Sequence, residues 1–161
     1  MSEHVRDPIR APKTSWHLDR LQRLVRGEAP PPPIAALIGF RIVEADLGRA
    51  MFELAVEPRH HNPMGTLHGG VIGDVADAAI GCAMASSLEA DETFTSLDLT
   101  TKFFKPVFAG RITAIARLIK RTRTLGFLEC DVTDDSGSLV ATVYSSCMVL
   151  RDDAAKGRTV R

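Results

Sequence analysis

Hydrophobic and polar residues alternate with a period of two along most of the second half of the chain. Such alternation is typical of strands that bury one face. The pattern predicts strands at 95–103, 112–118, 128–133 and 139–150, with a turn at 134–137. Both faces of the last segment are mostly apolar or small, so we expect that strand to lie in the interior of the sheet.

The N-terminal part predicts two short helices separated by a stiff connector. Ser15 can cap a helix that contains Trp16 and ends at Gly27. The four prolines 30–33 favour an extended polyproline connector. The last of these prolines can also start a brief helix, which Gly39 would end.

A hairpin and a long helix are predicted next. Segments 40–45 and 49–56 alternate with a period of two around a turn at 46–48. A loop at 58–65 follows, and the apolar stretch 68–86 predicts the central helix.

Together these elements predict an α+β fold, with one long helix packed against an antiparallel sheet. The helix is too apolar to be covered by a single face of a small sheet, which favours a dimer or a sheet that wraps around it. A membrane span is disfavoured because Asp74 and Asp77 interrupt the helix. Each would cost roughly 2.5–3.5 kcal/mol near a bilayer centre.

Composition narrows the function classes. The 161 residues include 20 Lys and Arg and 20 Asp and Glu, so the zero formal net charge gives no bulk field that attracts nucleic acid. Cys82, Cys130 and Cys147 lie far apart and form no paired motif, which favours reduced thiols of a cytoplasmic protein. The polar N-terminus has no apolar leader, so secretion is not expected.

Candidate chemistry lies in the loop and helix start Asn62–Gly70, followed seven residues later by Asp77. Glycines at a helix start leave backbone N–H groups bare, and the positive end of a helix suits a developing oxyanion. Two turns of helix rise roughly 10 Å, so Asp77 cannot easily reach that helix end in its own chain. A second subunit could bring its carboxylate there, which predicts a site at an interface.

Asp77 itself requires an explanation, because an ionised carboxylate among apolar neighbours is unfavourable unless it is hydrogen-bonded. It is either a general base or nucleophile, or an aspartate satisfied at a subunit interface. Asp74, one turn earlier, is interpreted as a solvated or interface residue.

Several other polar residues allow two interpretations. His68 can bind a substrate oxygen or cap the helix, and Asn62 can turn the loop or donate to a carbonyl. Ser96 can be a simple strand residue or hold a water for catalysis. His60 and His61, taken with His68, match no zinc signature, so no metal site is expected.

These residues resemble the hotdog-fold acyl-CoA thioesterases, in particular the phenylacetyl-CoA thioesterase-like branch related to the 4-hydroxybenzoyl-CoA thioesterases. The likeness covers about 34–150 and leaves 1–33 as an N-terminal extension and 151–161 as a polar tail. It includes a later strand at 96–99 that runs into Phe104-Lys105-Pro106. Its central motif, N-x-x-G-x-x-H-G-G-x6-D, consists of Asn62, Gly65, His68, Gly69, Gly70 and Asp77.

The resemblance implies a six-stranded antiparallel sheet wrapped around the long helix, in subunits that form homodimers and commonly homotetramers. It also implies roles for the site residues. The Gly69 N–H polarises the thioester with Asn62 beside it, and Asp77 of the other subunit is the base or nucleophile. Ser96 orients the water, and His68 shapes the site.

The implied reaction is hydrolysis of an acyl-CoA to a free acid and CoA, without a metal or cofactor. The basic residues of 111–123 are candidates for holding the CoA phosphates, or they form a solvated edge. Two alternatives stay open. Hotdog folds also include hydratases and dehydratases that leave the CoA attached, and a hotdog domain can serve as a non-enzymatic acyl-CoA-binding module.

Overall fold

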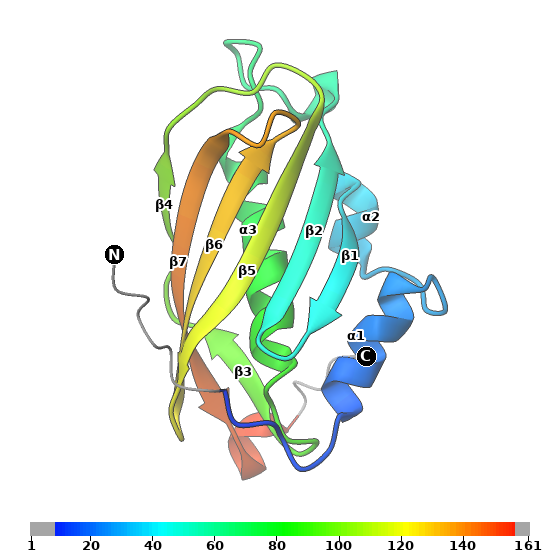
Figure 1. Ribbon diagram of the computed structural model, residues 1–161, viewed down its shortest axis with the longest axis vertical. Coiled ribbons are helices and arrows are strands. Elements are labelled where there is room, and N and C mark those ends of the chain that lie inside the picture. Colours follow the sequence, from blue (N-terminus) through cyan, green and yellow to red (C-terminus); the bar gives the residue numbers. More distant parts are fainter. Residues whose placement is uncertain (1–8, 157–161) are drawn as a thin grey trace.

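A computed structural model describes residues 9–156. The N-terminal extension 1–33 and the polar tail 151–161 lie partly outside the described residues. Two α-helices, α1 and α2, precede the sheet, and a third, α3, lies in the middle of the chain (Figure 1). Their bounds, with those of two 3₁₀ helices, are Trp16–Val25 (α1), Pro33–Ile38 (α2), Pro58–His60 (η1), Gly69–Ala85 (α3) and Asp152–Ala155 (η2).

Within residues 9–156, seven strands form one antiparallel sheet in the order β1-β2-β5-β6-β7-β3, and β4 also pairs with β7. The predicted α+β fold is therefore confirmed, and β7 is an interior strand as expected. The six strands that the resemblance implied are seven in residues 9–156, because one predicted strand is divided into β3 and β4. The strands are Arg41–Asp46 (β1), Arg49–Ala55 (β2), Thr93–Ser96 (β3), Thr100–Phe103 (β4), Arg111–Arg121 (β5), Leu125–Asp134 (β6) and Leu139–Leu150 (β7).

Helix α3 lies against the concave face of the curled sheet and forms most of its contacts with β2, β5 and β6 (Figure 1). Alternate residues of β5 are buried against it, and so is one side of α3. The approach is close: a Cβ at Gly126 of β6 would lie only 2.5 Å from Sδ of Met84. The core of the protein is thus the interface between this helix and the sheet.

The short helices follow most of the predicted signals. Helix α2 starts at Pro33 and ends at Gly39, whose φ of 98° is the left-handed conformation that favours glycine. Ser15 precedes α1, but its hydroxyl bonds the Asp19 carboxylate at 2.8 Å and not a backbone N–H. The predicted side-chain cap is therefore wrong. The tail also begins with ordered structure, the 3₁₀ helix η2.

The single strand predicted at 95–103 is two strands separated by a β-bulge. β3 pairs Ser96 with Cys147, and β4 pairs Thr100 with Tyr144, so three residues oppose two of β7. Asp98 fills the gap in the pairing. Its carbonyl accepts a hydrogen bond from the Ser145 hydroxyl at 2.7 Å, and its carboxylate accepts one from the Ser146 N–H at 3.0 Å.

The bulge changes which side chains face α3. In an unbroken strand, residues an odd number apart lie on opposite faces. Ser96 and Phe103 are seven apart, yet both face α3, because the extra residue reverses the alternation between them. The bulge therefore brings two different parts of this strand region onto the central helix.

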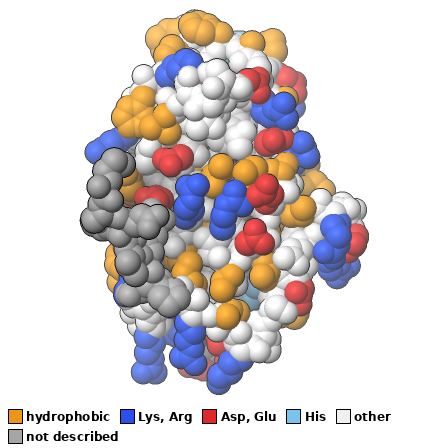
Figure 2. Space-filling model, viewed as in Figure 1, with side chains coloured by type: hydrophobic (Ala, Val, Ile, Leu, Met, Phe, Trp, Pro, Cys, Tyr) orange, Lys and Arg blue, Asp and Glu red, His pale blue; other side chains and the backbone are white. Residues whose placement is uncertain are grey.

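The outer face of the sheet mixes apolar, acidic and basic side chains, and Lys and Arg gather at one end (Figure 2). The cysteines of the described segment, Cys82, Cys130 and Cys147, are free thiols, as the sequence predicted. Among residues 9–156 no helix has the length and apolar character needed to cross a membrane.

Replacing a core residue of α3 should lower stability through the cavity that it leaves. Ile80 is fully buried between the helix and the sheet, so Ile80→Ala should lower the free energy of unfolding by about 2–5 kcal/mol in urea denaturation. The matched change Leu37→Ala, at a residue 71% exposed, should alter it by less than about 0.5 kcal/mol. Similar losses for both would contradict this description of the core.

Candidate active site

The loop before α3 is shaped by Asn62. Its side-chain oxygen accepts hydrogen bonds from the N–H groups of Met64 at 3.0 Å and Thr66 at 3.2 Å. Its amide nitrogen donates to the Thr66 hydroxyl at 2.8 Å. Gly65, at a φ of 76°, completes the turn. Of the two interpretations of Asn62, this geometry shows the one in which it turns the loop.

His68 caps α3 and selects which N–H group stays available. Its Nδ1 accepts a hydrogen bond from the Gly70 N–H at 2.9 Å. The preceding N–H, that of Gly69, has no hydrogen-bond acceptor within residues 9–156. The positive end of the helix dipole adds to the attraction of this donor for a negatively charged oxygen. The helix start therefore offers an oxyanion one unused backbone donor.

Helix α3 presents residues at intervals of four to the segment that contains β3 and β4. Four residues of the helix form this row. Three of them, Gly69, Gly73 and Gly81, are glycines, which let the segment approach the helix closely. The pairs are Gly69 with Phe103, Gly73 with Leu99, Asp77 with Ser96, and Gly81 with Phe94. A Cβ on Gly69 would lie 2.9 Å from the Phe103 ring. Asp77 carries the one carboxylate of this row.

Asp77 lies on an exposed stripe of α3 in the single chain, while its apolar neighbours face the sheet. The expectation that its carboxylate is enclosed by those neighbours is therefore wrong for one chain. Partial burial nevertheless raises the pKa of Asp77, the nearby Asp74 carboxylate raises it further, and a hydrogen bond from the Ser96 hydroxyl lowers it. Asp77 is thus a carboxylate whose proton affinity is increased by its surroundings.

Ser96 stands between Asp77 and a buried thiol. Its hydroxyl lies 4.0 Å from Sγ of Cys147, which is in turn 4.0 Å from the Ser145 hydroxyl. Ser145 is fixed by its hydrogen bond to the bulge carbonyl of Asp98. Contacts within the sheet therefore hold the Ser96 hydroxyl in position on the side away from Asp77. A group that orients Asp77 or a water needs to be held in this way.

His60 and His61 belong to the loop structure. His60 is buried, its Nδ1 accepts from the Glu57 N–H at 3.0 Å, and its Nε2 donates to the Ile38 carbonyl at 2.8 Å. His61 forms an isolated bridge with Leu67. In the part of the chain that the structure describes, no three His, Cys, Asp or Glu side chains are grouped as metal ligands.

The two halves of the candidate site are separated within one chain. Gly69 and Asp77 are eight residues apart on a straight helix, which corresponds to about 12 Å. The surface around them is unusually apolar for exposed positions. Large exposed side chains of this region are Met64, Leu97, Leu99, Phe103, Phe104 and Phe108.

The basic residues of 111–123 do not form one cluster. Arg111 pairs with Glu53 and Asp135, and Arg117 lies 3.8 Å from Asp131, so both belong to the charged face of the sheet. The other three line a cavity beyond the C-terminal end of α3: Lys120, Arg121 and Arg123. Arg10, Lys13 and Arg151 join them there, and no pattern along the chain predicts that these distant residues meet.

A curled antiparallel sheet around a helix that starts at a glycine pair and carries an aspartate two turns later defines an enzyme of the hotdog-fold thioesterase class. The sequence model of the Thioesterase superfamily matches residues 64–141. The 1,4-dihydroxy-2-naphthoyl-CoA hydrolase of Listeria monocytogenes is 33% identical over 112 residues, which are 70% of this chain and 89% of that protein. The chain belongs to the thioesterase superfamily.

Other relatives agree. Human acyl-coenzyme A thioesterase 13 is 31% identical over 102 residues, 62% of this chain and 72% of that protein. A phenylacetic acid degradation-related protein of Ralstonia eutropha JMP134 superimposes with a TM-score of 0.72 at 31% identity, over 80% of this chain and 98% of that one. A Pseudomonas aeruginosa thioesterase, at 22% identity, shares the fold with a TM-score of 0.75 over 89% and 100%. The predicted hotdog thioesterase is thereby confirmed.

The raised pKa of Asp77 predicts that its charge reduces stability. A carboxyl whose folded pKa exceeds the ordinary 3.8 loses stability as pH rises from that value through the raised one, and the loss is complete above it. Asp77→Asn should therefore raise the Tm at pH 7, and the gain should shrink toward pH 4. Differential scanning calorimetry at both pH values measures this, with exposed Asp91→Asn as the control. A lower Tm for Asp77→Asn at pH 7 would contradict the assignment.

Proposed function

We propose that the protein hydrolyses an acyl-CoA thioester to a free acid and CoA. The observation that carries the proposal is the combination of one unused N–H at the start of α3 with a carboxylate of raised pKa on the exposed stripe of the same helix. The names of the relatives, a naphthoyl-CoA hydrolase and an acyl-CoA thioesterase, support CoA esters as the substrate class.

In the proposed reaction, Asp77 accepts a proton from a water that attacks the thioester carbonyl, and the Ser96 hydroxyl orients that water. The C–O bond forms while the carbonyl oxygen becomes an oxyanion, which the Gly69 N–H stabilises. Collapse of this intermediate breaks the C–S bond, and the thiolate of CoA receives the proton that Asp77 holds. His68 contributes by capping the helix, and Asn62 by shaping the loop beside Gly69.

A second route would use Asp77 as the nucleophile and form an acyl anhydride that water then hydrolyses. The two routes put solvent oxygen in different products when water attacks the aspartyl carbonyl of the anhydride. In a single turnover in ¹⁸O-labelled water, direct attack puts the label in the released acid. Attack of water at the aspartyl carbonyl of an anhydride would instead label Asp77, which mass spectrometry of the protein detects.

The proposed site needs two chains. Gly69 and Asp77 of one chain are about 12 Å apart, too far to act on one carbonyl. A two-fold arrangement of two chains would place each helix start beside the partner's carboxylate and cover the exposed apolar residues around it. We therefore propose a homodimer as the minimal active unit, with pairing of dimers into a tetramer.

Free, partly buried thiols fit a reducing compartment, so we propose that the protein is cytoplasmic.

Removing the Asp77 carboxylate should abolish most turnover and keep the fold. Because a general base contributes about 10²–10⁴-fold, Asp77→Asn should lower kcat for acyl-CoA hydrolysis by that factor in a thiol-release assay. Asp74→Asn removes a neighbouring carboxylate from the same helix and should be mild. A near wild-type kcat in Asp77→Asn, or an equal loss in Asp74→Asn, would show that the wrong carboxylate was chosen.

Gly69→Pro should remove the proposed oxyanion donor with little effect on the helix. Proline is tolerated at the first helical position, and His68 before it already has the extended backbone that a following proline requires. We expect kcat to fall about 10²–10³-fold. Gly69→Ala is the matched control, because it adds a Cβ near Phe103 but keeps the N–H.

Mixing the two inactive variants tests the shared site. A heterodimer of Gly69→Pro and Asp77→Asn subunits contains one intact site, so random mixing should restore about a quarter of wild-type activity. Light scattering would verify that the mixture is oligomeric. A site made within one chain would give no restoration, and an active monomer would contradict the proposed dimer.

A further inference from the structure

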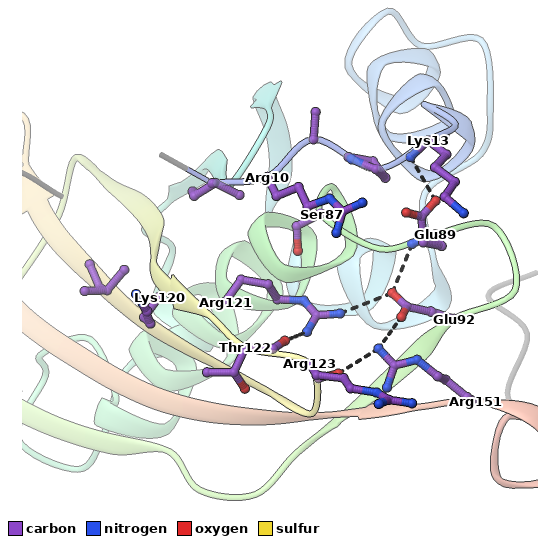
Figure 3. A pocket seen from close by; sticks show the side chains of 14 residues that line it. Arg10, Lys13, Ser87, Glu89, Glu92, Lys120, Arg121, Thr122, Arg123 and Arg151 are labelled. Atoms are coloured by element: carbon purple, nitrogen blue, oxygen red, sulfur yellow. Dashed lines mark hydrogen bonds and ion pairs between the residues drawn. The ribbon is translucent and has the colours of Figure 1, made fainter. Parts of the chain in front are cut away.

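A cavity of about 710 Å³ lies beyond the C-terminal end of α3, away from Gly69 (Figure 3). Its walls come from segment 9–13, the loop 87–92 that follows α3, the end of β5 with the turn after it (119–123), and Arg151 just after β7. Segment 9–13 and Arg151 lie outside residues 64–141, the part that matches the superfamily. The cavity is therefore built partly by residues outside the stretch that the superfamily model matches.

The cavity is strongly basic. Six cationic side chains and two carboxylates line it, which leaves a net positive charge of four. Concentrating like charges is unfavourable unless an anion binds among them. The charged residues are Arg10, Lys13, Glu89, Glu92, Lys120, Arg121, Arg123 and Arg151.

Glu92 holds the wall of the cavity in place. It is 8% exposed, and its carboxylate accepts hydrogen bonds from Arg121 at 3.2 Å, from Arg151 and from the Glu89 N–H at 3.1 Å (Figure 3). One negative charge is thus shared by two guanidinium groups. Burial lowers the pKa of Arg121 from its ordinary value, and the Glu92 carboxylate opposes this effect.

Three other cations of the cavity lie at exposed positions. Within residues 9–156 the side chains of Arg10, Lys13 and Arg123 form no ion pair, and all three are exposed to solvent. The Lys13 backbone N–H bonds Glu89 at 2.9 Å, which fixes this segment over the cavity. Arg123 is fixed too, because its carbonyl accepts a hydrogen bond from Arg151 at 2.7 Å. The cationic side chains available to a ligand therefore extend from backbone segments that these hydrogen bonds hold in place.

The walls also contain apolar groups, namely Ile9, Ala11, Pro12 and Ile119. A cavity of this volume exceeds the needs of a single inorganic anion and falls within the range of small-molecule sites. Guanidinium groups bind phosphate oxygens in a forked geometry, and apolar walls suit the body of a ligand such as a nucleoside. A ligand of the nucleoside diphosphate class satisfies both features.

We propose that this cavity is a binding site for a diphosphate-bearing nucleotide, held by Arg10, Lys13 and Arg123 over a wall organised by Glu92. The diphosphate could belong to a free nucleotide or to the CoA of the substrate. On α3, Asp77 is eight residues from Ala85, about 12 Å, and the cavity begins beyond that end. The CoA source rests on the proposed hydrolysis, whereas diphosphate binding itself does not.

Titration calorimetry of the full-length protein with ADP and with inorganic pyrophosphate tests the site. Both should bind, adenosine should not, and added salt should weaken binding. The double variant Arg10→Ala/Arg123→Ala should weaken ADP binding at least about tenfold, because charged hydrogen bonds are lost from exposed positions that do not support the core. Arg23→Ala, an exposed arginine of α1 outside the cavity, is the matched control.

Two results would overturn the proposal. One is that neither ADP, CoA nor pyrophosphate binds the wild-type protein. The other is that the double variant binds them as tightly as the wild type does. Because binding is measured without turnover, an inactive protein that binds ADP would refute the proposed hydrolysis and leave the nucleotide site intact.

Competition then identifies the source of the diphosphate. If the substrate's CoA occupies the cavity, CoA displaces ADP, and the double variant raises the KM for acyl-CoA but not for the corresponding acyl-pantetheine. If the cavity takes a free nucleotide, ADP binds alongside saturating CoA and the KM for acyl-CoA is unchanged. Either result supports a diphosphate site, and the two cannot both be obtained.

Discussion

The close packing of α3 in the concave face of the sheet is the constraint on which the other features depend. Small residues make it possible: alanines and glycines line much of the helix, and Gly126 leaves room for Met84 on the sheet side. A helix packed so closely leaves only a narrow exposed side, next to the segment that contains β3 and β4. The helix start and Asp77 both lie along that side, so the same packing that forms the core also determines where polar chemistry is accessible.

The bulge between β3 and β4 connects that packing to the candidate site. Without it, a regular strand would place Ser96 and Phe103 on opposite faces, and one of the two side chains would point away from α3. With it, Ser96 reaches the Asp77 carboxylate while Phe103 packs on Gly69. A local irregularity in strand pairing therefore places the hydroxyl, and it is stabilised by ordinary hydrogen bonds to Asp98.

Sequence patterns predicted the elements whose signals are local. The bounds of β7, the turn before it and the glycine that ends α2 follow from alternation and backbone preference at those residues. The bulge could not be predicted, because the alternation continues through 97–99 and the interruption depends on Ser145 and Ser146 of a distant strand. The basic cavity was missed for the same reason. Its residues come from four separate segments, and only tertiary folding brings Arg10 and Arg151 together.

The exposure of Asp77 in a single chain affects how its pKa would change when two chains associate. In the isolated chain, burial and Asp74 already raise its pKa, although its side chain is accessible on the open side of α3. Covering that side with a second chain would remove more water and raise the pKa further, unless a positive group approached. The start of the partner's α3 is such a group, since its unbonded Gly69 N–H lies at the positive end of a helix dipole. Association of two identical helices would therefore offset only part of the desolvation of each carboxylate. The pKa of Asp77 would stay raised, so the charge that reduces stability would be kept where the proposed chemistry uses it.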